Sequence, residues 1–300
     1  MKGVGERIVR RLRQGLLAIF SFLAALFCLS TGLAGPAHAH VLPGPQILEL
    51  MSDKISGIKT LKVDQRVTVV DPAVSAEPIT FQETLSYIFP DRFRSDFVYQ
   101  DNRRIHVVSR GQALTVVGDT IQDHGQAHYD QYKDLLLYNS AYLLQKTLYN
   151  NRIDVGITSL GRLGDQVVFV IGARYPDESV SQVWVDQERF VPLRWLDVQE
   201  NGEADQEERW DFLYSQWQKV DGAHYPFKIE TYHNQQLIRR IEVTRVDANA
   251  AIEAGIFDIA RLRSVYHQQQ VSQPDDEKPS PSDMDEVQRT IEDFRKKFEP

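Results

Sequence analysis

The sequence has almost no cysteine: Cys28 is the only one in 300 residues. Cys28 also falls within an N-terminal segment that we expect to be cleaved off. The remaining chain would then have no thiol, which excludes disulfides, thiol nucleophiles and cysteine metal sites. A domain of about 260 residues is large enough to bury a core without such cross-links.

Sequence motifs of catalysis are also missing. There is no Gly-x-Ser-x-Gly and no glycine-rich phosphate loop. His124 and His128 have the spacing of two zinc ligands on a helix, but Gly125 and the lack of apolar periodicity favour a polar loop, and no Glu stands beside His124. We therefore expect no enzyme, no metal and no cofactor. A zinc enzyme built on these two histidines is the alternative, which elemental analysis would test.

The first 39 residues have the three parts of a secretory signal peptide. The apolar run 16–33 is followed by Ala37 and Ala39, the A-x-A pattern that predicts cleavage before His40 and export to the periplasm. The run follows a basic stretch that contains Lys2, Arg7, Arg10, Arg11 and Arg13, offset by Glu6. The alternative is an uncleaved membrane anchor, because about 18 residues of helix nearly span ~30 Å of hydrocarbon.

The chain is short of positive charge. Its formal net charge is −8. The first 39 residues, the leader, contribute +4 to this sum, so the chain that remains after cleavage has a net charge of about −12. This acidic balance argues against nucleic-acid binding and against adhesion to anionic lipid surfaces. A freely diffusing periplasmic protein fits it.

Alternating apolar and polar residues fill most of the rest of the chain. Residues 45–56 form an exception, because Leu48, Met51 and Ile55 recur at helical spacing and predict an amphipathic helix. Elsewhere period-two alternation predicts a sheet with one apolar and one polar face. We expect strands at 61–69, 79–89, 92–99, 104–109, 113–117, 153–160, 166–172, 181–186, 191–199, 206–219, 225–233 and 237–246.

One internal segment and one residue depart from this alternation. Residues 134–150 are apolar almost all the way round, which predicts a helix that is buried on most sides and crosses a face of the sheet. Glu83 falls on the apolar face of its strand. It is either a functional carboxylate or, as is more common, a carboxylate at a rim or paired with an arginine.

The C-terminal part has a different composition. We expect one β-rich domain over 40–263, a flexible linker over 264–283 that is rich in Gln, Pro and Ser, and an amphipathic helix over 284–300. That helix either packs on its own domain or docks on a partner, because a single apolar stripe does not specify whose surface it covers.

The order of these elements resembles the LolA/LolB superfamily of periplasmic lipoprotein carriers and sensors over residues 46–262. Residues 85–94 (LSYIFPDRFR) resemble the family's strand, Pro turn and following Phe, and 108–114 (VSRGQAL) its next hairpin. Residues 257–259 (FDI) resemble the segment that closes the domain, and 225–229 (YPFKI) resemble the outer-membrane lipoprotein-sorting proteins in particular.

The resemblance implies a mainly β (α+β) fold, in which a curled antiparallel sheet of about 11 strands forms an unclosed half-barrel and helices cover its concave face as a lid. It also implies a carrier that holds acyl chains of lipoproteins or other lipids between sheet and lid, with a membrane-protein donor or acceptor. The alternative is a lipoprotein-sensing regulator on the same scaffold that binds a membrane partner.

The candidate lipid-binding residues combine the apolar face of the early strands with the segment 134–150. They are Phe81, Leu85, Tyr87, Phe89, Phe93, Phe97, Leu136, Tyr142 and Leu144. A plainer interpretation is that each belongs to the ordinary core, and only a cavity among them would favour a ligand. Phe89 also departs from the family pattern, because LolA-type carriers have an arginine immediately before the Pro turn that helps to latch the lid.

Overall fold

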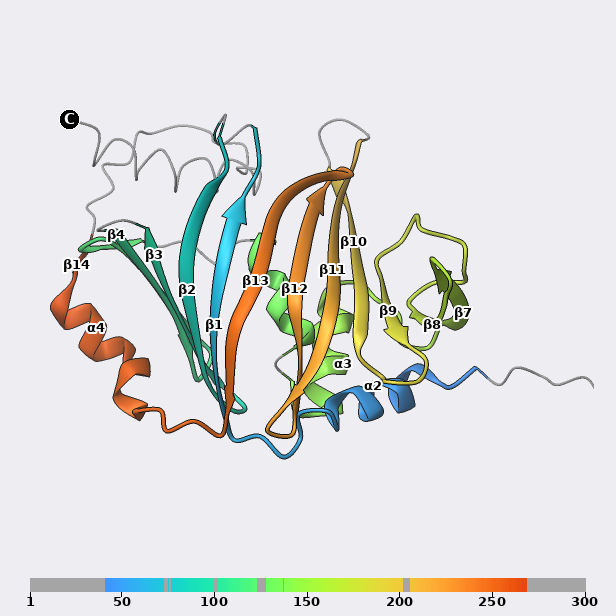
Figure 1. Ribbon diagram of the computed structural model, residues 1–300, viewed down its shortest axis with the longest axis horizontal. Coiled ribbons are helices and arrows are strands. Elements are labelled where there is room, and N and C mark those ends of the chain that lie inside the picture. The colour runs from blue at the N-terminus through green and yellow to red at the C-terminus, as the bar shows by residue number, and fades with distance from the viewer. Residues whose placement is uncertain are drawn as a thin grey trace, which may run out of the picture. The chain divides into compact units, whose positions relative to one another are not determined.

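The computed structural model of the protein describes residues 41–72, 75, 77–99, 102–122, 128–136, 138–201 and 206–268. These residues form one sheet of 14 strands in the order β14-β6-β5-β4-β3-β2-β1-β13-β12-β11-β10-β9-β8-β7 (Figure 1). Neighbouring strands are antiparallel except for β14 and β6, which are parallel. The order has two ends, so the sheet is an unclosed half-barrel, as predicted.

The strands follow the chain in long meanders that meet where β1 pairs with β13. Their bounds are β1 Thr60–Val69, β2 Ile79–Ile88, β3 Arg92–Tyr99, β4 Asn102–Ser109, β5 Gln112–Val117, β6 Thr120–Gln122, β7 Thr158–Leu163, β8 Gln166–Ile171, β9 Gln182–Asp186, β10 Pro192–Asn201, β11 Gln206–Val220, β12 Ala223–His233, β13 Gln236–Ala248 and β14 His267–Gln268.

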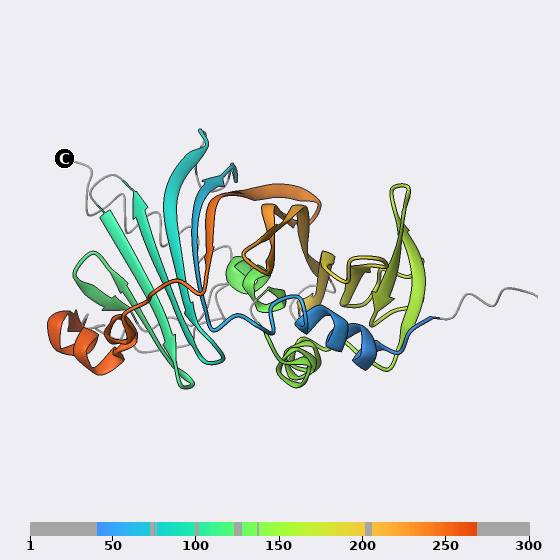
Figure 2. The ribbon, with the colours of Figure 1, turned by 60° about the horizontal axis from the view of Figure 1, so that its bottom comes forward.

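Three helical segments cover the concave face of the sheet, and we call them together the cover. They are the α-helix α2 (Gly44–Ser52), the 3₁₀ helix η2 (His128–Leu135) and the α-helix α3 (Ala141–Asn150). Figure 2 shows α2 and α3 side by side beneath the strands, where they contact each other. The main core lies between the cover and the sheet.

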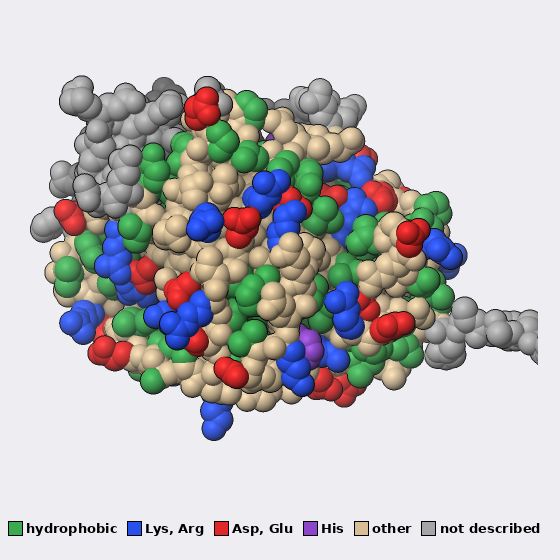
Figure 3. All heavy atoms as spheres, viewed as in Figure 1, with side chains coloured by type: hydrophobic (Ala, Val, Ile, Leu, Met, Phe, Trp, Pro, Cys, Tyr) green, Lys and Arg blue, Asp and Glu red, His purple; other side chains and the backbone are tan. Residues whose placement is uncertain are grey.

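The period-two pattern assigned the faces of the central strands correctly. Leu61, Val63 and Val67 of β1 are almost fully buried, whereas Lys62, Asp64 and Arg66 on the other face are less buried. The opposite face carries interspersed basic and acidic side chains over these strands (Figure 3), some of them paired, as in Arg66 with Glu242 at 3.7 Å and Lys228 with Glu230 at 2.9 Å. In its centre, the sheet therefore has one buried face and one solvent-exposed face.

A second layer lies against the outer face near one end of the sheet. The 3₁₀ helix η3 (Ala254–Phe257) and the α-helix α4 (Ile259–Val265) pack Phe257 and Ile259 against the outward side chains of β4 and β5. The sequence patterns did not predict α4, β6 or β14, and the strand count is 14, where about 11 were expected. These elements are short, so their period is hard to detect.

The predicted helix over 134–150 was wrong in its extent and its burial. The structure divides this segment: η2 ends at Leu135, and α3 begins at Ala141. α3 buries only one stripe, Leu144 and Leu148, while Tyr142 is 72% exposed and Tyr149 79% exposed. Helix α3 lies at the outside of the cover, so apolar residues on its far side face solvent.

One predicted strand was also misplaced. Residues 153–157 lie outside any strand, with a turn at 155–156, and β7 begins only at Thr158 and continues to Leu163. The leader, most of the expected linker and the helix over 284–300 lie outside the described residues, so these domain boundaries stay predictions.

Candidate functional site

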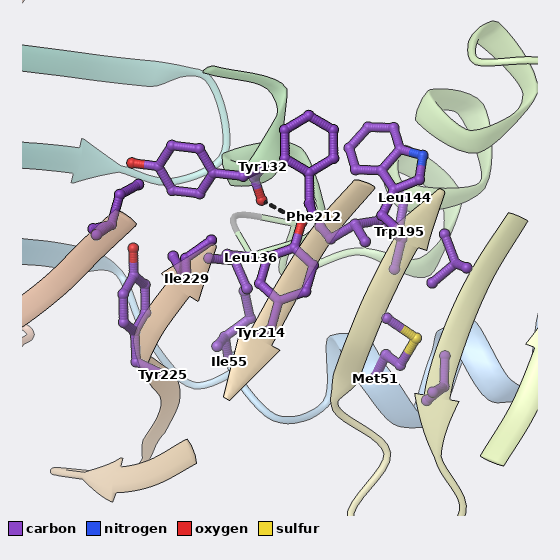
Figure 4. Close-up of a cluster of buried hydrophobic side chains, with 14 of the residues drawn as sticks. Met51, Ile55, Tyr132, Leu136, Leu144, Trp195, Phe212, Tyr214, Tyr225 and Ile229 are labelled. Carbon is purple, nitrogen blue, oxygen red and sulfur yellow. Dashed lines mark hydrogen bonds between the residues drawn. The ribbon is translucent and has the colours of Figure 1, made fainter. Parts of the chain in front are cut away.

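The interface between the cover and the sheet has an apolar half. On the sheet side it consists of large side chains from β10, β11 and β12, and on the other side of residues from α2 and the turns after it, η2 and α3 (Figure 4). All of them are at most 7% exposed: Trp195, Phe212, Tyr214 and Ile229 face Met51, Ile55, Leu136 and Leu144. In this half, apolar packing holds the cover in place.

A narrow crevice enters this apolar half from outside. Its lining includes Met51, Leu136, Leu144, Phe190 and Trp217, and its volume is about 20 Å³. That volume has room for about one water molecule, whereas ligand pockets usually have about 300 Å³ or more. An acyl chain can therefore enter here only if the cover moves away from the sheet.

The cover is joined to the sheet through side chains. Among the residues that the structure describes, no hydrogen bond between backbone atoms links α2, η2 or α3 to a strand. One of the links is a side-chain hydrogen bond, in which the Tyr214 hydroxyl donates to the Tyr132 carbonyl at 2.9 Å. Displacing the cover would thus leave the β ladder intact.

The other half of the interface is charged, and we call it the polar cluster. It lies where η2 meets β1–β5, β12 and β13, and it consists of Gln65, Glu83, Ser95, Arg104, His106, Thr115, Asp130, Tyr132, Lys133, Thr231 and Arg239. Each of these side chains belongs to a residue that is at most 7% exposed. Such charges are rarely buried unless they are paired.

Asp130 of η2 lies at the centre of the polar cluster. Its Oδ1 is 3.0 Å from Nη1 of Arg239, and its Oδ2 is 3.4 Å from Nζ of Lys133 and 3.6 Å from Nη1 of Arg104. Burial raises the pKa of Asp130, but the charges of Lys133, Arg239 and Arg104 outweigh this effect and hold the pKa well below its usual range. The carboxylate is therefore ionised and ties the cover to the sheet.

Glu83 is paired with an arginine, which was the more common of its two predicted roles. Its Oε2 accepts a hydrogen bond from Gln65 at 2.6 Å and lies 3.6 Å from Nη2 of Arg239, and its Oε1 accepts one from Ser95 at 2.6 Å. Gln65 also donates to the Tyr132 hydroxyl at 2.8 Å. This network connects β1, β2, β3 and β13 with η2.

His106 is a titratable member of the polar cluster that carries no charge at neutral pH. Its Nδ1 lies 2.9 Å from Oγ1 of Thr115 on the neighbouring strand. Burial, followed by the charges of Lys133 and Arg104, lowers the pKa of His106 to about 4. The ring is therefore uncharged at neutral pH, and the positive charge of the cluster comes from Lys133 and the two arginines.

The structure brings most of the nine predicted residues together. Leu85, Tyr87, Leu136 and Leu144 are buried in the main core, and Phe89, Phe93 and Phe97 are partly buried against it. Phe81 is buried outside this core, against Phe97, with ring centroids 4.5 Å apart. Tyr142 is the exception, because it points away from this core and is exposed. The role of the set in lipid binding stays a prediction.

The sequence interpretation missed the β10–β12 side of the site and the polar cluster. Trp210, Phe212 and Tyr214 alternate along β11, so their period could have identified the apolar wall. Arg239 likewise shares its face with Ile241 and Val243, a signal of a buried cation. Phe89, the residue immediately before the Pro90 turn, stacks on Tyr87 with ring centroids 6.2 Å apart.

The described residues contain neither a cluster of metal ligands nor a membrane-spanning helix. In the part of the chain that the structure describes, no group of three or more potential metal ligands occurs. No helix there is long and apolar enough to cross a membrane. His124 and the side chain of His128 lie outside the described residues, so the histidine pair stays untested.

The fold and the site define a class: an unclosed half-barrel, almost entirely antiparallel, whose concave face is covered by helices. No protein-family model matches the chain, and no curated protein matches it in sequence. Similar solved structures include a domain described as an outer membrane lipoprotein-sorting protein from Vibrio parahaemolyticus. It has 11% identity and a TM-score of 0.47, and the match covers 73% of this chain and 99% of that one.

Two other similar structures come from different bacteria. A LolA superfamily protein from Nitrosomonas europaea has 11% identity and a TM-score of 0.46, with 74% of this chain and 100% of that one covered. A DUF1329 family protein from Desulfovibrio piger has 11% identity and a TM-score of 0.43, with 74% and 99% covered. At these identities and TM-scores, function has to be argued from the residues of this chain.

Proposed function

We propose that this protein is a periplasmic carrier of acyl chains, which it holds between the concave face of the sheet and the cover. The observation that carries the proposal is that cover and sheet share a large apolar interface but no backbone hydrogen bond among the described residues. The cover can therefore leave the sheet at the cost of apolar burial and of the side-chain contacts of the polar cluster, without unfolding the β ladder.

When the cover opens, apolar surface of the cover and the sheet is exposed to water. An acyl chain inserted between them would bury that surface again. Each methylene that leaves water contributes ~0.8 kcal/mol, and full burial of a side chain such as Leu144 contributes about 1.5–3 kcal/mol. A few methylenes thus offset the exposure of one covering side chain. The predicted signal peptide and the sequence resemblance to periplasmic carriers support the same function, with lipoproteins or other lipids as cargo and a membrane protein as donor or acceptor.

The test is the lipid content of the protein as the cell makes it. Protein purified from the periplasm without detergent is expected to carry acyl lipids that native mass spectrometry detects and organic solvent extracts. A protein that carries no lipid and takes up none from added vesicles of phosphatidylglycerol and phosphatidylethanolamine would overturn the proposal.

Two substitutions on α3 provide a matched comparison. Leu144 is 1% exposed and faces the sheet, whereas Tyr142 is exposed on the same helix. Leu144→Asn is expected to reduce lipid uptake at least tenfold, and Tyr142→Asn to leave it unchanged, with circular dichroism as the check that both variants fold. Equal uptake by the two variants would place the acyl chains elsewhere.

A further inference from the structure

The polar cluster contains more charge than closure of the cover requires. Apolar residues of similar volume usually close such an interface at least as well as buried ion pairs do. Nevertheless η2 turns both an acid and a base inward: Asp130 is 1% exposed and Lys133 2%. These charges therefore call for an explanation other than stability.

The two sheet arginines reach the same carboxylate from distant strands. Arg104 lies on β4 and Arg239 on β13, which are separated by β3, β2 and β1 in the sheet. In a flat sheet such strands would be roughly 19 Å apart. The curvature of the sheet lets both guanidinium groups converge on Asp130, so the sheet itself forms a positively charged cradle for one anion.

Other buried donors face the same region. The Lys133 ammonium group makes no hydrogen bond with the described residues, although it pairs with Asp130 and lies 4.6 Å from the centroid of the Phe93 ring. The Thr231 hydroxyl, on the residue paired with Arg239, also lacks a described hydrogen-bond partner. Buried polar groups in this state are unusual, and a further acceptor beside them would satisfy both donors.

Opening of the cover changes the charge of the cradle. Asp130 and Lys133 leave together because both belong to η2, whereas Arg104, Arg239 and Glu83 stay on the sheet. The sheet then has one net positive charge beside an apolar surface. Both arginines lose the carboxylate that they contact in the closed state.

We propose that Arg104 and Arg239 bind the anionic headgroup of the lipid, a phosphate or a carboxylate, in the place that Asp130 occupies when the cover is closed. This inference rests on the proposed carrier function and adds the class of lipid. Asp130 is then a built-in competitor, which fills the cradle when no cargo is present. Guanidinium groups suit this role because they stay charged and match the geometry of phosphate and carboxylate oxygens.

The test compares lipids that share a chain and differ in charge. Palmitate is compared with hexadecanol, and palmitoyl lysophosphatidic acid with monopalmitoyl glycerol, by native mass spectrometry of the full exported chain. The wild type is expected to prefer the anionic member of each pair by about tenfold, since one good charged contact has that effect. Equal affinity for both members would overturn the inference while leaving the carrier function standing.

Substitutions of Arg104 and Arg239 test whether the cradle causes the preference for anionic lipids. Arg104→Gln and Arg239→Gln are expected to reduce the preference to about twofold or less, and Arg104→Lys to retain part of it. Arg240→Gln is the matched control, because Arg240 follows Arg239 on β13 but is 41% exposed and pairs with Glu230. The readout is a ratio of two affinities, so a general loss of stability affects both terms alike. An unchanged preference in both glutamine variants would overturn the assignment.

A competition experiment distinguishes a lipid headgroup from free phosphate as the anion that binds. Inorganic phosphate is expected to compete with lysophosphatidic acid only at concentrations at least a hundredfold higher, because it lacks the acyl chain. Competition by phosphate at equal concentration would overturn the inference that the cradle recognises a lipid. Failure to bind any of the four lipids would instead overturn the proposed function itself.

Discussion

Asp130 is the residue that joins the cover to the sheet by charge. Its carboxylate contacts Arg239 at 3.0 Å and Arg104 at 3.6 Å, and the three side chains are almost fully buried. Removing one member of a buried ion cluster is costly, because the remaining charges stay in a medium of low dielectric constant. The closed state therefore depends on this one side chain more than on any single apolar contact of η2.

Asp130→Asn is expected to lower the free energy of unfolding by about 3–5 kcal/mol at pH 7, because the cations around it lose their counter-charge. Urea unfolding monitored by tryptophan fluorescence measures the change. Asp91→Asn is the control, since half of the Asp91 side chain is exposed, and we expect an effect within about 0.5 kcal/mol. A loss for Asp130→Asn no larger than that of the control would contradict the structure.

The same residue has a predictable pH dependence. Because its folded pKa lies below its unfolded pKa of about 3.9, Asp130 stabilises the protein fully above about pH 5, and this stabilisation declines as the pH falls toward the folded pKa. The unfolding free energy of the wild type should thus fall more steeply below about pH 4 than that of Asp130→Asn. Parallel curves for the two proteins would show that Asp130 is not held ionised.

At the scale of elements, the N-terminus of α2 is fixed by a close backbone contact. A Cβ atom on Gly44 would lie 2.1 Å from the carbonyl oxygen of Val155, whereas a Cβ atom on Gly57 would have no heavy atom within 4 Å. Backbone atoms cannot move aside as the end of a side chain can. A residue larger than glycine at position 44 must therefore displace α2 from the loop that follows α3.

Gly44→Ala is expected to lower the free energy of unfolding by about 1–3 kcal/mol, the usual cost of overpacking, and Gly57→Ala to lower it by less than about 0.5 kcal/mol. Thermal unfolding of both variants measures the difference. The contact would be refuted by equal melting temperatures for the two alanine variants.

Helix α3 allows the opening of the cover to be measured directly. The exported chain is expected to lack cysteine, so single cysteines can be introduced without interference. Leu148 is fully buried and its neighbour Tyr149 is 79% exposed. Leu148→Cys is expected to react with a thiol reagent at least a hundredfold more slowly than Tyr149→Cys, and to speed up when phosphatidylglycerol vesicles are added.

Protection of Leu148→Cys that does not change with lipid would mean that the cover stays closed during binding. Tyr149→Cys serves as the control for changes in the reagent itself, because its rate should not depend on lipid. Leu148→Cys could also react because the whole protein unfolds. Its rate of reaction is therefore measured again in sucrose, which suppresses global unfolding and affects local opening less.

At the scale of the whole molecule, the described sheet and cover close on each other between residues 41 and 268. Deletion of residues 284–300 is therefore expected to leave acyl binding unchanged within about twofold, as measured by native mass spectrometry. The alternative, a lipoprotein-sensing regulator, is tested by a pull-down. It predicts that deletion of 284–298 abolishes recovery of a membrane partner, although lipid binding remains.

Much of the fold could be predicted from local patterns, because a strand that is half buried shows its period within five or six residues. Most strands were found in this way, as was the unusual position of Glu83. The division of 134–150 could not be predicted, because an apolar residue such as Tyr142 looks the same on a buried and on an exposed face of a helix. Helix α4 and β6 were too short for their period to be recognised.

The sequence by itself determined which residues alternate and hence which face of the central strands is buried, since side-chain direction follows directly from the backbone of a strand. Only the tertiary structure decided that β1 pairs with β13 and that Arg104, Asp130 and Arg239 meet at one point. The reason is that such contacts depend on the curvature of the whole sheet and on segments far apart in the chain. No local period encodes them.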